Sequence, residues 1–485
     1  MSIAKALNNA VSGLTATARG TETVASNLAN IMTPGYARRE VTQSAQTLGG
    51  YGGGVRIDGI SRAVNATLVA ESRLAQSGSA DARTRLDFLS QMGDIVGLPG
   101  EEGALSTILG EFTNALQAAA TRPDDELRLA GVVDAAERLA ERLNAASGAV
   151  QDARAAADRA IESEVATINT KLEQVAYLNR RIAIIESEGN DPSSLLDQRQ
   201  AAIDAIAEIV PVQEVARDGG RVALFTTGGA VLLDGSRPSR FEFSAVGQMT
   251  PDLSVGTPPV MRILQNGIEL SAAQMRLFEG GSLAAHFAVR DQLAPQMQME
   301  LDALAFDLHE RLADAAIDAT YPATAPGLFA DGGARASLPT ITGLSARITL
   351  NPLVNPDAGG ELFRVRDGLG SASSGPVADS TLLLAMADAL SASTAFAGGA
   401  GFEGNGSLSS RFSELESRVA LRRVAAESES SVRNSRSETI SGRLMADGVD
   451  SDAEMQRLLQ YEQAYAANAR VIQAIEEMMD QILRL

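Results

Sequence analysis

The chain has 485 residues and a formal net charge of −20 at pH 7, and 45% of its residues are hydrophobic but only 4% aromatic. This acidic balance argues against a nucleic-acid-binding protein and against attachment to anionic membranes, because both need basic patches. The absence of cysteine excludes disulfides, thiolate metal sites and cysteine nucleophiles. No apolar run reaches the roughly 18 residues that a membrane-spanning helix needs, and Asn8 and Asn9 interrupt any signal-peptide core.

Residues 1–45 are predicted to form a helix followed by an extended segment. Side chains recur at alternating spacings of three and four, at Ile3, Leu7, Ala10, Leu14, Thr17, Thr21, Val24, Leu28 and Ile31. That spacing is a heptad seam, typical of a coiled coil. Thr33-Pro34-Gly35 is expected to end the helix, because proline cannot continue it. Residues 36–60 are read as extended chain and loop, with a flexible elbow in the glycine-rich run 49–54.

Residues 46–209 are predicted to be the first part of a helical bundle. Helical patterns cover about 62–89, 104–120, 124–188 and 195–209, separated by glycine- and proline-containing turns. The third pattern predicts a long rod-like helix, with Gly148 as its weakest point.

Residues 210–280 are predicted to form an inserted antiparallel β domain. Short runs rich in β-formers occur at 212–215, 222–226, 230–233, 241–243 and 261–264, and Asp218-Gly219 and Asp234-Gly235 read as hairpin turns. Residues 281–446 return to a helical pattern with intervening loops and are predicted to be the second part of the bundle. Their helices are expected from residue 281 to about 317, at 380–395 and at 408–445.

Residues 447–485 are predicted to be the second half of the coiled coil. Capping side chains at Asp450, Ser451 and Asp452 precede an unbroken stripe of Leu458, Tyr461, Tyr465, Asn468, Ile472, Ile475, Met479 and Ile482. Two matched seams favour pairing of the two ends over packing of each on a globular core. Whether Tyr461 and Tyr465 pack on the chain's own first helix or on a neighbouring subunit stays open.

The sequence therefore predicts a mainly α protein: paired terminal coiled-coil helices, an α-helical bundle and a small antiparallel β domain. The residues expected to form the assembly seam are Ile3, Leu7, Leu14, Val24, Leu28, Leu458, Tyr461, Tyr465, Asn468, Ile472, Ile475, Met479 and Ile482.

No catalytic, cofactor or metal site is predicted. The two histidines, His286 and His309, lie 23 residues apart in helical patterns, without an HExxH motif. No GxSxG nucleophile elbow, Walker-type lysine or EF-hand loop occurs. An enzyme carried by the β domain is the alternative of a different class, and the lack of any catalytic constellation disfavours it.

Several motifs resemble those of flagellar axial proteins. Residues 26–30 (SNLAN) and 33–38 (TPGYAR) resemble the N-terminal signature of rod, hook and junction proteins, and residues 461–472 (YEQAYAANARVI) resemble that family's C-terminal motif. In the centre, residues 190–199 (NDPSSLLDQR), Val210-Pro211-Val212 and the Gly228-Gly229 hairpin resemble the FlgK family, as does Gly280-Gly281-Ser282-Leu283-Ala284. Glu462, Ala466 and Asp450 depart mildly from the family pattern.

The resemblance implies a structural protein at the junction between flagellar hook and filament, exported without a cleaved signal peptide. It implies self-association in a ring, contact with the hook protein and the next hook-associated junction protein, and an export chaperone that binds the C-terminal region. A hook or distal rod protein of the same axial family is the alternative, which the central 190–199 motif disfavours.

Overall fold

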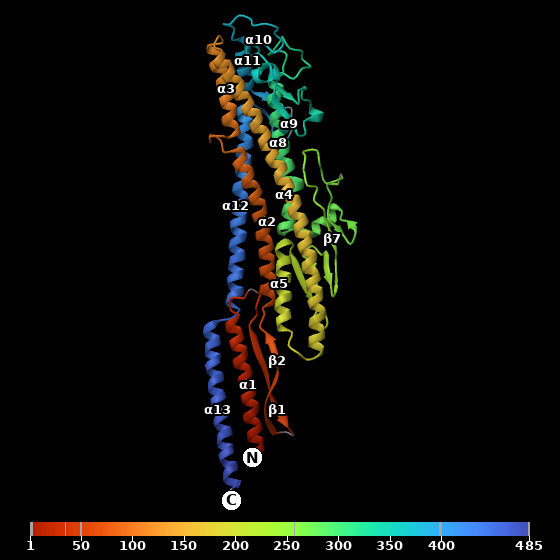
Figure 1. Cartoon of the computed structure of the whole chain (residues 1–485), viewed down its shortest axis with the longest axis vertical. Helices are drawn as coiled ribbons and strands as arrows, with labels where there is room; N and C mark the ends of the chain where they lie inside the picture. The colour runs from red at the N-terminus through yellow and green to blue at the C-terminus, as the bar shows by residue number, and fades with distance from the viewer. Residues whose placement is uncertain (1–2, 34, 49–50, 257, 397–399, 484–485) are drawn as a thin grey trace.

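A computed structural model describes residues 3–33, 35–48, 51–256, 258–396 and 400–483. The molecule is a long rod of helices with a smaller unit at one end, and both termini lie at that end (Figure 1). We call residues 3–62 and 451–483 the terminal module and the remainder the rod.

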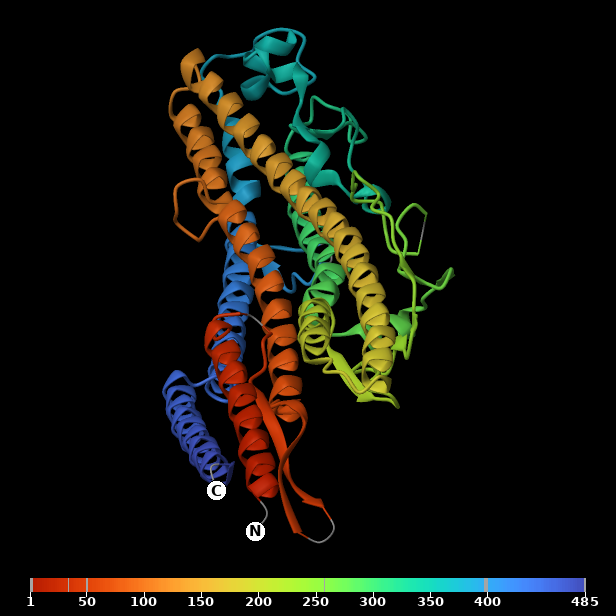
Figure 2. The ribbon, with the colours of Figure 1, turned by 60° about the horizontal axis from the view of Figure 1, so that its bottom comes forward.

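The terminal module contains two helices and a β-hairpin. Helix α1 (Ile3–Ala29) contacts α13 (Ser451–Leu483) along its length, and strands β1 (Arg39–Leu48) and β2 (Tyr51–Arg62) pair antiparallel and cover another side of α1 (Figures 1 and 2). The hairpin runs across the boundary that the sequence places between residues 45 and 46. Residues 51–54 belong to β2, so the predicted elbow is wrong there. Gly49, Gly50 and Pro34, expected in that elbow and at the helix end, lie outside the described residues.

Long helices build the rod. Helix α2 (Ala66–Val96) lies beside α12 (Leu408–Ala446), and α4 (Glu126–Ser187) contacts α3 (Leu105–Thr121) and α8 (Ala294–Leu312). The predicted long rod-like helix is confirmed, because α4 runs unbroken through Gly148. Asp125 begins it by accepting a hydrogen bond from the backbone N–H of Leu127 at 3.0 Å. Its apolar stripe is buried against α3 and α8. In the same core, Phe112 of α3 meets Phe329 edge to face, with the ring centroids 5.9 Å apart.

The helix expected from residue 281 to about 317 is interrupted. It consists of α7 (Gly281–Ala288), a π-helical turn (Val289–Leu293) and α8, which ends at Leu312. The π turn presents Arg290 to the interior, where its guanidinium donates to Asp158 of α4 at 2.7 Å and to the carboxylate of Asp291. A buried arginine needs such partners, and a hydrophobic periodicity cannot reveal them.

Helix α5 (Ser193–Ile209) follows α4 and leads into the β region. Strands β3 (Val212–Ala216), β4 (Val222–Thr226), β5 (Val231–Asp234) and β6 (Arg237–Pro238) form an antiparallel sheet in sequence order, and β7 (Phe241–Glu242), β8 (Leu264–Gln265) and β9 (Ile268–Glu269) form a second. Both expected hairpin turns lie between strands, whereas the strand expected at 261–264 begins only at Leu264. Apolar side chains of α4, α5 and these strands share one core.

Helix α6 (Ala272–Met275) adjoins the β region, where Met275 packs against its core. The other short elements are α9 (Leu344–Arg347), α10 (Phe363–Asp367), α11 (Thr381–Ser391) and the strand pairs β10 (Phe329–Asp331) with β11 (Ile348–Leu350) and β12 (Thr394–Ala395) with β13 (Asn405–Gly406). The helix expected at 380–395 is thus shorter, ending at Ser391.

Candidate assembly interface

The contacts between α1 and α13 fall at steps of seven residues. Gly13 lies against Asn468 and Gly20 against Tyr461, while Asn27 hydrogen-bonds Glu454. Each step of seven forward on α1 is a step of seven back on α13, so the two helices run antiparallel. A spacing of seven residues is that of a heptad seam.

Glycine brings the two backbones close. A β-carbon added to Gly20 would lie 2.5 Å from the ring of Tyr461, and one added to Gly13 would lie 2.7 Å from the amide nitrogen of Asn468. No side chain fits at either position without displacing its neighbour. The two glycines thus form hollows that receive Tyr461 and Asn468 as knobs.

Asn27 is the polar centre of the module. Fully buried, its amide nitrogen donates to the backbone carbonyl of Arg39 at 2.9 Å and to the carboxylate of Glu454 at 3.0 Å. Its amide oxygen accepts from the backbone N–H of Arg39 and the hydroxyl of Tyr36, both at 2.9 Å. One side chain thus joins α1, the start of the hairpin and α13, which gives the Asn of the SNLAN motif a physical role.

The carboxylate of Glu454 has a second partner. Fully buried in the first turn of α13, it accepts a hydrogen bond from Arg457 at 2.7 Å. Arg457 also approaches Glu40 of β1 at 3.5 Å. A buried carboxylate needs compensation of this kind. Asp450 begins the helix as the sequence predicts, accepting from the backbone N–H of Asp452 at 2.8 Å.

The predicted seam residues are not equally covered. Val24 and Ile475 are buried, whereas the side chains of Tyr465, Met479 and Ile482 are about half exposed. The remaining eight are partly buried, namely Ile3, Leu7, Leu14, Leu28, Leu458, Tyr461, Asn468 and Ile472. The structure brings the two seams together, but α1 covers only one side of α13.

Several contact residues are absent from the predicted seam: Gly13, Gly20, Asn27 and Glu454. Three of them could be found from the sequence, because Gly13, Gly20 and Asn27 are spaced seven residues apart. A search for apolar side chains passes over them, because two of these residues have no side chain and the third is polar.

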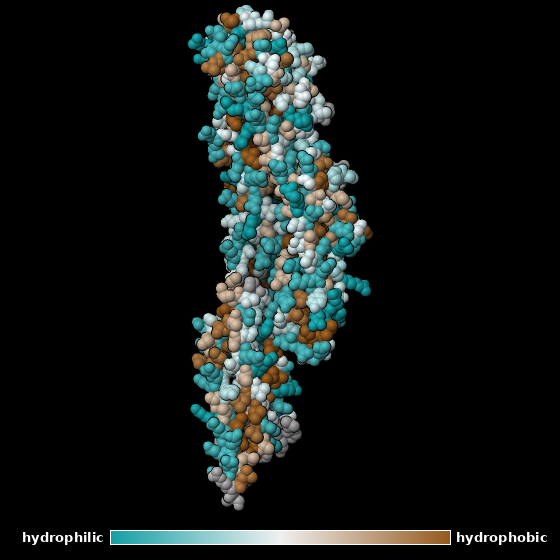
Figure 3. All heavy atoms as spheres, viewed as in Figure 1, coloured by the Kyte–Doolittle hydropathy of each residue, from teal (hydrophilic) through white to brown (hydrophobic). Residues whose placement is uncertain are grey.

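Much of the apolar surface of the module has no partner within the chain. Apolar side chains gather on the lower part of the molecule, where α1 and α13 lie (Figure 3). On α13 the exposed ones include Met455, Leu459, Val471 and Met478. A groove of about 470 Å³ also opens between the two helices, lined by Ala18, Thr21, Glu22, Glu462 and Tyr465. Such a surface is typical of an interface with further copies or partners.

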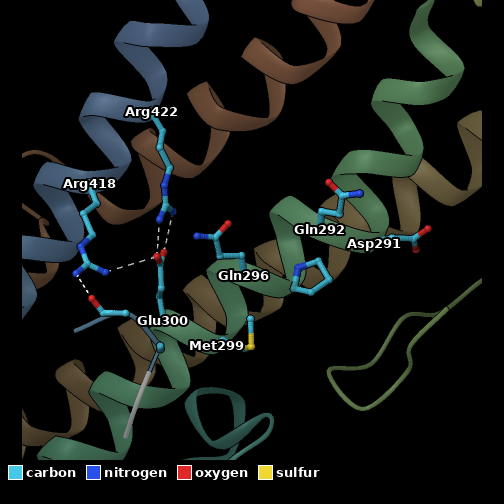
Figure 4. A pocket seen from close by; sticks show the side chains of 10 residues that line it. Asp291, Gln292, Gln296, Met299, Glu300, Arg418 and Arg422 are labelled. Atoms are coloured by element: carbon cyan, nitrogen blue, oxygen red, sulfur yellow. Dashed lines mark hydrogen bonds and ion pairs between the residues drawn. The ribbon is translucent and has the colours of Figure 1, made fainter. Parts of the chain in front are cut away.

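The rod has a separate cleft of about 570 Å³ between α8 and α12 (Figure 4). Its floor is Glu300, which is only 2% exposed and accepts two hydrogen bonds from Arg422 at 2.9 and 2.5 Å. Arg418 lies 3.9 Å from the same carboxylate. Both arginines lie on α12, so their contacts with Glu300 hold α12 to α8.

The two histidines take structural positions. His309 is buried; its Nδ1 lies 2.9 Å from the backbone carbonyl of Phe329, and its Nε2 accepts from the backbone N–H of Ala336 at 3.1 Å. Burial lowers the pKa of His309 below its ordinary value. His286 lies beside Glu164 on another part of the rod. In the described ranges, no group of three or more potential ligands is placed to hold a metal ion, and no helix is long and apolar enough to cross a membrane.

Comparison with protein families finds flagellar proteins along the chain. The model of the flagellar hook-associated protein FlgK helical domain matches residues 89–316. The C-terminal model of flagellar basal body rod FlgEFG proteins matches residues 440–485, and the flagella basal body rod protein model matches residues 7–36. The two end matches cover most of α1 and all of α13, and the central match covers α3, α4, α5, the β region, α7 and α8.

Curated relatives share one name. Flagellar hook-associated protein 1 of Salmonella typhimurium is 30% identical over 237 residues, which cover 47% of this chain and 42% of the relative. The protein of that name from Escherichia coli is 26% identical over 311 residues, covering 63% and 55%. That from Bacillus subtilis is 27% identical over 240 residues, covering 47% of each. The chain thus spans about half the length of the curated relatives it matches.

Among solved structures, the flagellar hook junction protein FlgK from Burkholderia pseudomallei is similar over 54% of this chain and 47% of its own. The sequence identity is 26% and the TM-score is 0.45.

Proposed function

We propose that the chain belongs to the family of flagellar hook-associated protein 1 and is a structural component of the bacterial flagellum that forms the junction between hook and filament. The observation that carries the proposal is the pairing of α1 with α13 at one end of a long rod, with unpartnered apolar side chains on the outer sides of the pair. A helix pair that buries only one side is suited to polymerisation through its other sides.

In the assembled ring, the terminal helices build the inner tube. Residues 1–45 and 447–485 supply its two halves, with the hairpin extending the first half to residue 62. The helical bundle of residues 46–209 and 281–446 faces outward, and the β domain of residues 210–280 is an outer decoration. The unequal burial of the seam supports this arrangement, because Tyr465, Met479 and Ile482 remain free to contact neighbouring copies.

The proposed partners are other copies in the ring, the hook protein on one side and the next hook-associated junction protein on the other. An export chaperone binds the C-terminal region before secretion, and the final location is the extracellular flagellum. The half-exposed apolar side chains of α13 support a chaperone, since they would otherwise be open to aggregation before assembly. The proposed role involves no nucleic acid, membrane, cofactor or catalysis.

A hook or distal rod protein of the same axial family is the second candidate. The matches at residues 7–36 and 440–485 favour it as much as they favour a junction protein, because both are models of rod-type proteins. The match of the FlgK helical domain to residues 89–316 favours the junction protein.

Deletion of the gene separates the two candidates. Loss of a junction protein leaves cells with complete hooks but no filaments, and filament subunits appear in the medium. Loss of a hook or rod protein leaves cells without hooks. Complete hooks on non-motile deletion cells, restored to motility by the full chain, are the expected result. Absence of hooks, or normal filaments, would contradict the proposal.

A further inference from the structure

The terminal module and the rod are joined by few connections. The chain crosses between them at residues 63–65, after β2, and at residues 447–450, before α13. Neither crossing is a continuous helix, so neither fixes an angle between the two parts. An orientation between them has to be set by contacts across the joint.

One side chain of the rod makes several contacts with the terminal module. The carboxylate of Asp197, on α5, accepts hydrogen bonds from Arg62 Nε at 2.8 Å, from Arg39 Nη2 at 3.1 Å and from the backbone N–H of Ala37 at 3.3 Å. All three donors belong to the terminal module. They come from the end of β2, the start of β1 and the residues between α1 and β1. A single carboxylate thus binds both strands at the base of the hairpin, where β1 begins and β2 ends.

The same face of α5 adds two further contacts. Gln200 accepts from Arg62 Nη2 at 3.0 Å, and Ala201 lies close to Gly35, whose positive φ of 78° lets the chain turn there. The opposite face of α5 is fixed in the rod, because Ile203 and Ile206 are buried in its core. Asp197 therefore lies on a helix that is packed in the core of the rod, and it contacts the hairpin of the terminal module.

A cleft of about 670 Å³ lies beside this contact. It runs between the first turns of α2, α5 and the edge strand β3, and Arg62 and Gln200 form part of its wall. Among the residues that line it, Arg62 comes from the terminal module and the others from the rod, so the contact between Arg62 and Gln200 borders open space on this side.

We propose that Asp197 is a positioning residue for assembly: it latches the hairpin to α5 and thereby sets the angle of the terminal module on the rod. This inference rests on the proposed function, since a ring needs its subunits to present their terminal helices at one angle. The side chains of Asp197, Arg62 and Arg39 are 15%, 13% and 20% exposed. At that exposure, the charges are screened by solvent much less than those of an exposed ion pair.

Loss of the carboxylate removes the ionic attraction across the joint. Arg39 and Arg62 are cross-strand neighbours in the hairpin, so their guanidinium groups lose the counter-charge that they share and repel each other within the terminal module. We expect the base of the hairpin to be released from α5, while the core of the rod is unaffected because none of these side chains belongs to it.

Paired spin labels measure the angle directly. The chain has no cysteine, so Glu173→Cys on α4 and Gln473→Cys on α13 give one labelled pair between rod and module. In the dilute full-length protein, we expect a single narrow distance distribution. Asp197→Asn should broaden it or shift its maximum, with the thermal unfolding midpoint of the rod unchanged. The control Asp204→Asn removes one of the two carboxylate partners of Arg73, a contact within the rod, and should leave the distribution as it was.

A charge swap tests whether the contact acts through its charges. Asp197→Arg alone should broaden the distribution, and Asp197→Arg combined with Arg62→Asp should narrow it again. A merely structural defect at residue 197 would not be rescued in this way. A broad distribution in the unmodified protein, or no change in Asp197→Asn, would overturn the latch.

A second experiment, independent of the spin labels, measures filament formation in cells. Cells carrying Asp197→Asn should have hooks but lose most of their filaments, and cells carrying the charge swap should regain them. Filaments as abundant with Asp197→Asn as with the unmodified chain would overturn its role in assembly. If the unmodified chain has no part in the hook–filament junction, the proposed function is wrong. The spin-label distances then still show whether Asp197 sets the angle between the terminal module and the rod.

Discussion

Gly20 and Asn27 lie seven residues apart on the face of α1 that meets α13, and each sets a different property of the helix pair. Gly20 sets how closely the helices approach, because the ring of Tyr461 occupies the space of its missing side chain. Asn27 sets their register, because its amide finds all four partners only when Glu454 and Arg39 are in place. A polar residue at a seam commonly specifies register in this way.

Gly20→Ala should separate the two helices. The new β-carbon would lie 2.5 Å from the ring of Tyr461, so the ring or the helix has to shift, and overpacking of this kind costs about 1–3 kcal/mol. We expect faster hydrogen exchange in α1 and α13 and weaker filament formation. Gly442→Ala is the matched control, since that helical glycine of α12 has open space around it. Equal exchange rates in both variants would argue against close packing at Gly20.

His309 should make the stability of the rod sensitive to acid. Its Nε2 accepts from the backbone N–H of Ala336, so protonation there would set two donors against each other. Burial holds the folded pKa below the ordinary value of about 6.5. Between that value and the lower folded pKa, the unfolded chain binds a proton that the folded one does not. The contribution of His309 to stability is therefore complete above about pH 6.5 and is lost as the pH falls.

The measurement is the free energy of unfolding as a function of pH. The unmodified chain should lose more stability between about pH 7 and pH 5 than His309→Gln does. An NMR titration of the His309 ring in the unmodified chain checks the same point without a substitution. A ring that titrates at or above the ordinary value would contradict it.

At the level of elements, the heptad patterns predict the two terminal helices and their pairing, because a repeat of seven brings the same face round on every second turn. The same patterns do not place the interface on α1 correctly. The hairpin covers another side of that helix, so apolar and small residues occur on two faces, and the stripe read from the sequence mixes them. Helix α4 was predictable for a simpler reason: its apolar positions are regular along the whole helix.

Elements held by polar contacts were harder to predict. Asp197 and Arg39 are 158 positions apart, and nothing in the local sequence of either residue indicates the other. The π turn at 289–293 likewise depends on a buried arginine and its carboxylate on α4. The β region was located by its turn residues, whereas its short strands were displaced by a few positions because side-chain packing, not propensity, sets their ends.

Ile475→Asp should unpair the end of α13 and leave the rod folded. Ile475 is the best-buried apolar side chain of α13, and an unpaired carboxylate in its place would be strongly unfavourable. We expect limited proteolysis to remove the end of α13 rapidly, with the melting of the rod unchanged. Ala474→Asp is the control, because it introduces the same charge on the exposed side of the helix. Equal resistance of both variants to protease would count against the seam.

At the level of the whole molecule, the terminal module proposed to polymerise and the rod proposed to face outward are separate parts. The terminal module lies at one end with both chain termini, and the rod extends away from it with the β region on its flank (Figure 1). Two chain crossings and the contacts around Asp197 join the two parts. A subunit built this way can present its terminal helices to the lattice while the rod extends outward.

The proposed role can be tested by electron cryomicroscopy of the boundary between hook and filament, on flagella isolated from the native organism. We expect a ring of this chain at that boundary, with α1 and α13 paired antiparallel, Gly20 against Tyr461, and the pair lining the central channel. A ring without this chain, or one in which its terminal helices are unpaired or lie on the outer surface, would contradict the proposed role.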